Sequence, residues 1–237
     1  SPLPRRIHVM PVMGNHDAFP SDRLVVDLIY LAITRLREQR PEVVIVNLSG
    51  GNRFRPFHGQ VSPWARLLDR LSNRFGLLFI VSAGNATTEF GMPGFATGLA
   101  YEGANANDRA TAMIGSLHAL IGERRILSPA ETVNGITVGA CNGDAVSPAE
   151  RALARGFIDP YPAHDAPNPS SSLGPGFARS VKPDILMPGA REHMQVVRNH
   201  AHIDVRPGQA SRGAGLKVAA PPAGGRENLD GYTNGTS

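Results

Sequence analysis

Two polar residues of this chain have the chemistry of an acyl-transfer site. Ser237 ends the tetrapeptide 234–237 (NGTS), and Asn85 ends the segment 81–85 (VSAGN). A serine hydroxyl attacks a carbonyl carbon once a base takes its proton, and an asparagine amide can donate a hydrogen bond to the oxygen that then becomes negative. Each short motif is common, so alone Asn85 is as compatible with a turn as with catalysis.

Small residues follow the first of two predicted strands and form a second set of candidates. Residues 43–48 (VVIVNL) and 77–81 (LLFIV) are apolar runs with the length of a buried strand. Ser49, Gly50 and Gly51 come after the first run, and small residues there allow another backbone, such as that of a bound peptide, to approach closely. An ordinary strand-to-loop turn is the alternative. The second run leads through Ser82, Ala83 and Gly84 to Asn85, at the edge of a parallel sheet where α/β enzymes place their sites.

The hydrophobic pattern predicts the elements that must position these residues. Apolar runs alternate with helical periodicity, which is typical of an α/β fold with a mostly parallel sheet and helices on both faces. Ser21 or Asp22 is expected to cap the first helix, and Pro63 is expected to open the second. Strands are expected at residues 7–13, 43–48, 77–81, 135–140 and within 182–189, and helices at residues 24–36, 64–75 and 109–121.

The chain changes character beyond the fourth predicted strand. Residues 142–180 and 205–231 are rich in proline, glycine and small residues, and they are expected to form surface loops and irregular structure. No internal repeat and no convincing linker is visible. Residues 1–237 are therefore expected to form part of a single domain.

Composition narrows the possible functions. The 237 residues carry a formal charge of +4, and the basic residues are dispersed, which argues against a nucleic-acid partner. No run approaches the ~20 apolar residues of a membrane-spanning helix, so no membrane partner is expected. The single cysteine, Cys141, excludes an internal disulfide and favours a reducing compartment such as the cytoplasm.

No cofactor or metal is expected either. No acidic loop has the ligand density of a calcium site. His200, His202 and Asp204 alternate along the chain and could share one face of a strand as metal ligands. A solvated hairpin is the favoured interpretation of this stretch.

Five segments, taken in their order, resemble the subtilisin-like (subtilase) serine peptidase family. The segments are 46–51 (VNLSGG), 82–85 (SAGN), 128–130 (SPA) with 136–140 (ITVGA), 171–175 (SSLGP) with 182–189 (KPDILMPG), and 234–237 (NGTS). The third and fourth are expected to be structural turns and strand ends. The resemblance implies a subtilisin-like α/β fold and hydrolysis of peptide bonds in a peptide or protein substrate by an Asp-His-Ser triad.

The resemblance also implies a role for each candidate residue. Ser237 matches the nucleophile, and Asn85 matches the asparagine of the oxyanion hole. Ser49, Gly50 and Gly51 match the strand end that pairs with extended substrate. Ser82, Ala83 and Gly84 match one wall of the pocket for the side chain before the cleaved bond.

The catalytic aspartate and histidine of the family are not found in the expected order. In this family the triad runs Asp, His, Ser along the chain, and both partners precede the strand at 43–48. His58-Gly59 lies after that strand and His16-Asp17 follows the first strand, so both are assigned to loops. The domain is therefore expected to be incomplete at both ends and inactive alone, with the missing N-terminal part of the same domain as its partner.

Two other classes of function compete with a peptidase. A non-catalytic subtilase-like domain that binds peptides or acts as a scaffold remains the alternative, although such a domain has no chemical need for either Asn85 or Ser237. A flavodoxin-like nucleotide binder is disfavoured, because no glycine-rich phosphate loop follows the first predicted strand.

Overall fold

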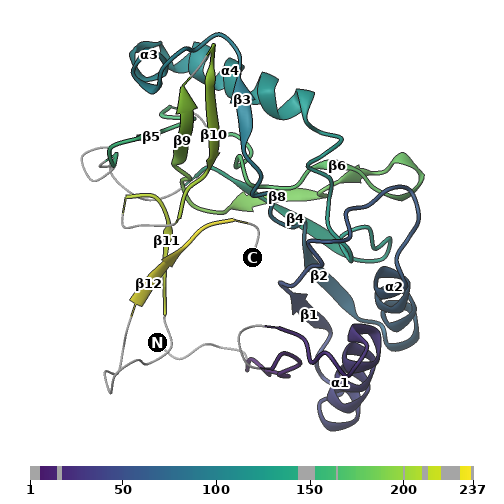
Figure 1. The fold of residues 1–237 in the computed structure, drawn as a ribbon. Coiled ribbons are helices and arrows are strands. Elements are labelled where there is room, and N and C mark those ends of the chain that lie inside the picture. Colours follow the sequence, from purple (N-terminus) through teal and green to yellow (C-terminus); the bar gives the residue numbers. More distant parts are fainter. Residues whose placement is uncertain are drawn as a thin grey trace.

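Two four-stranded sheets of different type form the framework of the described molecule (Figure 1). The computed structural model describes residues 6–14, 18–143, 153–163, 165–199, 201–209, 213–219 and 230–235. The first sheet is fully parallel, with the strand order β1-β2-β4-β8. Its strands are β1 (Ile45–Leu48), β2 (Leu78–Ser82), β4 (Ile136–Cys141) and β8 (Ile185–Pro188). The prediction of an α/β fold with a parallel sheet is confirmed.

Helices α1 (Val25–Gln39) and α2 (Pro63–Phe75) pack together against the parallel sheet. Helix α2 begins where the sequence predicts, because the Ser62 hydroxyl accepts a hydrogen bond from the Ala65 N–H and proline occupies the first helical position. It ends at Gly76, which adopts the left-handed conformation that glycine tolerates. The shared core of the two helices and β2 consists of Ile29, Ile33, Leu36, Trp64, Leu68, Leu71, Leu77, Phe79 and Val81.

The second sheet is antiparallel and forms a separate layer with the remaining helices (Figure 1). Its order is β3-β10-β9-β5, and it packs with α3 (Gly98–Gly103) and α4 (Ala106–Ala119). The strands are β3 (Phe90–Met92), β5 (Phe157–Ile158), β9 (Met194–Asn199) and β10 (Ile203–Pro207). This layer has its own hydrophobic core, which includes Tyr101, Met113, Tyr161, Met194, Ile203 and Val205. The helices are thus divided between the two layers.

Two smaller pairs of strands complete the described fold. They are β6 (Gly174–Pro175) with β7 (Val181–Lys182), joined through the 3-10 turn η3 (Phe177–Arg179), and β11 (Leu216–Ala219) with β12 (Asp230–Thr233). No helix within the described residues is long and apolar enough to cross a membrane.

Several expectations about local structure are wrong. Residues 6–14 contain no strand, and Ile7 and Val9 are 75% and 79% exposed. A strand needs a neighbour for its hydrogen-bond ladder, and among the described residues none pairs with this segment or with the outer edge of β1. Helix α1 begins without a side-chain cap after Leu24, so neither Ser21 nor Asp22 caps it.

The loop-rich regions are more ordered than expected. Residues 203–207, 216–219 and 230–233 are strands, each too short to show a clear alternating pattern. Within 142–180, the segment that includes Asn168, Ser170, Ser171 and Ser172 is buried rather than on the surface. Its main-chain groups tolerate burial because they form hydrogen bonds with the backbone of Gly84, Ala86 and Ala140.

Candidate active site

The carboxyl ends of the parallel strands meet at a shallow pocket of about 200 Å³. This edge of a parallel sheet is where α/β proteins commonly bind ligands. The described residues that line it come from all four strands and from two later segments: Asn47, Ser49, Ile80, Val81, Ser82, Val138, Gly139, Met187, Pro188, Gly189, Leu216 and Gly235. None of these is a histidine or an aspartate.

Asn85 follows a sharp turn at Gly84. The φ angle of Gly84 is +99°, and a Cβ atom there would lie 2.5 Å from Cγ of Leu127. Glycine is therefore required for both reasons, the backbone angle and the close approach. On the other side, the Ala86 N–H donates to the Ser170 carbonyl at 2.7 Å, and the Ser172 N–H donates to the Gly84 carbonyl at 3.0 Å. These two bonds fix the backbone of Asn85 from both sides.

The side chain of Asn85 lies against the chain segment that leads to Ser237. A Cβ atom on Gly235 would lie 2.8 Å from Oδ1 and 3.0 Å from Nδ2 of Asn85. Gly235 is itself bound to the end of β8, since its N–H donates to the Gly189 carbonyl at 3.2 Å. Ser237 lies outside the described residues. The structure thus brings Asn85 next to the start of the Gly-Thr-Ser motif, two residues before the predicted nucleophile.

The predicted substrate-binding residues form two neighbouring walls. Ser49 and Ser82 line the pocket, and the Asn47 amide donates to the Ser49 hydroxyl at 3.1 Å. Ala83 is fully buried and uses both its backbone groups within the protein, donating to Val138 and accepting from Leu127. Ala83 can therefore form a wall, but it has no free backbone group for a substrate.

Leu127 occupies the space between these walls, a position that motif reasoning missed. Its Cβ lies 3.7 Å from the place of a Cβ on Gly51, and it also contacts Gly84 as described above. Gly50 lies further out, with its nearest contact to Cε of Met13. No local signal marks Leu127, because its position depends on hydrogen bonds of its neighbour Ser128 with Asn52 and Arg55.

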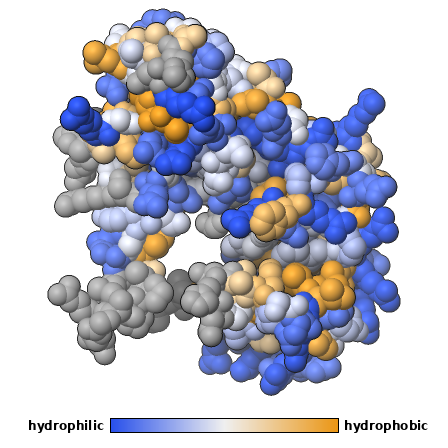
Figure 2. Space-filling view, viewed as in Figure 1, coloured by the Kyte–Doolittle hydropathy of each residue, from blue (hydrophilic) through white to orange (hydrophobic). Residues whose placement is uncertain are grey.

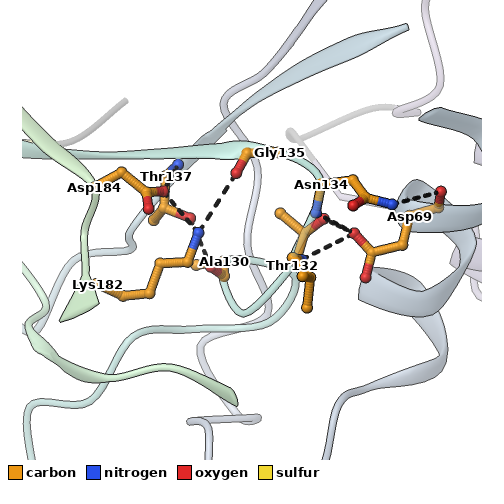
Figure 3. Close-up of polar contacts among 9 residues, drawn as sticks. Asp69, Ala130, Thr132, Asn134, Gly135, Thr137, Lys182 and Asp184 are labelled. Atoms are coloured by element: carbon orange, nitrogen blue, oxygen red, sulfur yellow. Dashed lines mark hydrogen bonds and ion pairs between the residues drawn. The ribbon is translucent and has the colours of Figure 1, made fainter. Parts of the chain in front are cut away.

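The polar groups at the opposite end of β4 are structural, as the sequence predicts (Figure 3). The Lys182 ammonium lies 2.6 Å from Oδ2 of Asp184, which also accepts from the Thr137 N–H at 2.6 Å. Asp69 of α2 accepts from the Val133 and Asn134 N–H groups at 2.9 and 2.8 Å. These contacts fix the start of β4 and the loop before it, away from the pocket.

Two of the histidines considered as ligands or bases, His58 and His202, lie in the described part of the chain, and neither lines the pocket. His58 is exposed in a loop, as predicted. His202 lies at the turn between β9 and β10, 3.5 Å from Asp204, which agrees with the hairpin interpretation. His200 and the His16-Asp17 pair lie outside the described residues. In the described part of the chain, no group of three or more His, Cys, Asp or Glu residues is placed to hold a metal.

Two oppositely charged side-chain types are buried beside the segment 170–172, which pairs with Asn85. Glu192 is 1% exposed and accepts from the Ser170 N–H at 2.8 Å, and Arg124 is 4% exposed. Burial raises the pKa of Glu192 to about 7, although the Ser170 N–H and Arg124 oppose the shift. Burial lowers the pKa of Arg124, against the opposing effects of Glu192 and Tyr161. Motif reasoning missed both residues, since charged residues are usually on the surface.

The chain belongs to the subtilase family, because the model of that family matches residues 6–237. The predicted resemblance is thereby confirmed. The chain is 32% identical over 159 residues to the uncharacterized protein y4bN of Sinorhizobium fredii (strain NBRC 101917 / NGR234), a match that covers 65% of this chain and 32% of that protein. Among solved structures, the structure of the prenylagaramide maturation protease PagA is matched with a TM-score of 0.35 and 16% identity over 80% of this chain and 46% of that one. The chain therefore spans about a third of the length of the curated relative.

The close approach at Gly84 predicts a graded loss of stability. Gly94 has a φ of +97° but nothing within 4 Å of its Cβ position, so Gly94→Ala is a control for backbone strain alone. That change should destabilise by about 1 kcal/mol, and Gly84→Ala by about 1–3 kcal/mol more because Leu127 must move. Urea denaturation measures both. Adding Leu127→Ala should recover part of the loss at Gly84, and equal losses at the two glycines would contradict the packing argument.

The buried carboxyl of Glu192 predicts a pH dependence of stability. Its pKa is about 7 in the folded chain and near 4.5 in the unfolded chain. Between these pH values the folded chain therefore binds one proton that the unfolded chain has released. The contribution of Glu192 to the free energy of unfolding is therefore fully present below pH 4.5 and is lost as the pH rises through 7. Glu192→Gln does not titrate, so the Tm of this variant relative to the unsubstituted protein should rise over that range.

The matched control for this experiment is Glu123→Gln, which changes an exposed carboxyl. Its Tm relative to the unsubstituted protein should not follow the pH trend of Glu192→Gln. An unchanged slope in Glu192→Gln would mean that the carboxyl does not titrate in this window.

Proposed function

We propose that this chain supplies the nucleophile, the oxyanion donor and the substrate cleft of a serine endopeptidase. The observation that carries the proposal is the contact of the Asn85 amide with Gly235, two residues before Ser237. The Ser237 hydroxyl would attack a peptide carbonyl while a histidine takes its proton. The Asn85 Nδ2–H would then donate to the carbonyl oxygen as it becomes negative. The amine leaves with the proton of that histidine, and water releases the acyl group from Ser237.

The histidine and its aspartate are proposed to come from the N-terminal part of the same domain. Support comes from the described residues around the pocket, which include neither residue type. The open edge of β1 is a suitable contact surface, because Val44 and Ile45 are 56% and 52% exposed. Figure 2 shows apolar side chains at the surface in this region of the molecule, near β1 and α1. Burial of such a patch on association is favourable.

The substrate is proposed to be a peptide or protein with a small residue before the cleaved bond. The two walls assigned to that side chain end at Gly51 and Gly84, and the side chain of Leu127 lies between them. A large substrate side chain would have to displace Leu127, which is costly in a packed site. A small one would not.

A non-catalytic peptide-binding or scaffold role is the second candidate. It is favoured by the same absence of histidine and aspartate among the described residues of the pocket. The two candidates differ in whether Ser237 is reactive. A fluorophosphonate probe on the intact protein should label Ser237 if the protein is a peptidase, because the probe requires an activated serine.

The role of Asn85 predicts a specific change in kinetics. In the intact protein, Asn85→Ala should lower kcat by about 10²–10³-fold, the loss known for the same kind of change in subtilisin itself. KM should stay within about threefold, because the oxyanion charge exists only in the transition state. The measurement compares hydrolysis of alanyl p-nitroanilide peptides by the two proteins, with Tm as a control for folding.

Other results would point away from this role. If kcat stays within about threefold while the Tm falls, Asn85 is a turn residue only. If the unsubstituted protein neither hydrolyses these peptides nor reacts with the fluorophosphonate at Ser237, the peptidase proposal is wrong and the binding role is favoured.

The position of Leu127 predicts a change in specificity. Leu127→Ala should raise the kcat/KM ratio of phenylalanyl over alanyl p-nitroanilide peptides by at least about tenfold, because the space between the walls is opened. Leu120→Ala removes the same group from the core of the antiparallel layer and is the matched control. That change should lower the Tm without altering the ratio. An unchanged ratio in Leu127→Ala would show that the substrate side chain binds elsewhere.

A further inference from the structure

One peptide group behind Asn85 is bound at both ends by buried charges. The Pro169–Ser170 peptide has its carbonyl oxygen at Nη2 of Arg124 and its N–H at Oε2 of Glu192, the latter at 2.8 Å. The guanidinium of Arg124 thus binds the negative end of the peptide dipole, and a carboxyl oxygen of Glu192 binds the positive end. Hydrogen bonds of this kind to charged groups are about twice as strong as those between neutral groups.

This peptide group is directly connected to the backbone around Asn85. The Ser170 carbonyl accepts from the Ala86 N–H at 2.7 Å, and Asn85 lies opposite Ser171 in an antiparallel bridge. Arg124 also reaches the Ala86 carbonyl from the same Nη2 atom, at 3.1 Å. Both backbone groups of Ala86 are therefore held, one by Ser170 and one by Arg124.

The two charged residues are themselves held by both layers of the molecule. The Glu192 N–H donates to Oδ1 of Asn142, which follows β4 of the parallel sheet, at 2.7 Å. The Arg124 guanidinium lies over the ring of Phe90 in β3, 5.1 Å from its centroid. The backbone carbonyl of Arg124 also accepts a hydrogen bond from the Leu173 N–H at 2.9 Å. Through Glu192 and Arg124, the Pro169–Ser170 peptide is thus connected to residues of both layers.

Stability alone does not require these charges. Burying an arginine and a glutamate carries a desolvation cost of several kcal/mol per ion, and well-packed apolar residues are often as stable in such places. What charged groups provide is a defined position for the group they bind, and an oxyanion donor must be held to within about 0.5 Å to be effective.

We propose that Arg124 and Glu192 are positioning residues for the oxyanion hole: together they fix the Pro169–Ser170 peptide, and through Ala86 they orient Asn85. The inference rests on the proposed function of Asn85. Neither residue touches substrate. Their loss should therefore act through Asn85 alone and affect the transition state more than the ground state.

A double-mutant cycle with Asn85 tests this in the intact protein. Arg124→Met keeps the apolar stem and removes the charge, and it should lower kcat for an alanyl p-nitroanilide peptide by about 10–100-fold with KM within about threefold. In the Asn85→Ala background the same change should lower kcat by less than about twofold, because the group it positions is gone. Arg124→Lys, which keeps the charge, should recover part of kcat.

Arg109→Met is the matched control for loss of a partly buried arginine. Arg109 in α4 also donates to a backbone carbonyl, that of Ala104, and lies over the ring of Tyr101. Neither contact involves residues 84–86 or 169–173. Its substitution should leave kcat within about twofold, whatever its effect on Tm.

The outcomes separate the two proposals. An equal loss from Arg124→Met with and without Asn85 would overturn the positioning role and leave the proposed function intact. A normal kcat in Asn85→Ala itself would overturn the proposed function, and the positioning role with it. If circular dichroism shows that Arg124→Met does not fold, the same double-mutant cycle is carried out with Glu192→Gln. The positioning role would be overturned if Glu192→Gln left kcat unchanged, or if it lowered kcat equally with and without the Asn85 side chain.

Discussion

The candidate site depends on the backbone pairing of residues 84–86 with residues 170–172. This contact places a buried polar segment beside the end of β2, and it is made only of main-chain hydrogen bonds between parts of the chain that lie in different motifs. It fixes the backbone on both sides of Asn85. Main-chain groups of residues 168–172 also bond to Ala140 at the end of β4 and to Gly84 and Ala86 after β2, which allows the backbone of this segment to be buried.

Close backbone contact at glycines allows the last described segment to join this arrangement. A Cβ atom on Gly189 would lie 2.3 Å from Cβ of Ala140 and 2.7 Å from the carbonyl oxygen of Gly235. A Cβ on Gly235 would in turn collide with Asn85. The end of β8, the end of β4 and the segment before Ser237 can therefore meet at one point only because these positions have no side chain. The same contacts keep the pocket shallow.

The two layers contribute to the site in different ways. The parallel sheet presents the ends of its strands, which carry the small and polar residues of the pocket. The antiparallel layer packs its own core and carries Phe90, which covers Arg124, while Glu192 lies between β8 and β9. A rigid second layer of this kind can hold a reactive group in place without contacting the ligand, which is a general requirement for preorganised sites.

The amino-acid sequence by itself determined the family, the parallel strands from residue 45 onward and the helices with clear end signals. Helix α2 is the best example, because Ser62, Pro63 and Gly76 specify its two ends through local contacts. The strand expected at residues 7–13 did not form, since a strand depends on a neighbour that local pattern cannot supply.

Only the tertiary structure decided how the site is assembled. The contact of Asn85 with Gly235, the insertion of Leu127 between the two walls, and the charges on either side of the Pro169–Ser170 peptide all join residues distant in the chain. Their approach is set by strand order and by which positions lack a Cβ atom. No window of sequence contains both partners of such a contact, so pattern alone could name Asn85 but could not show what holds it.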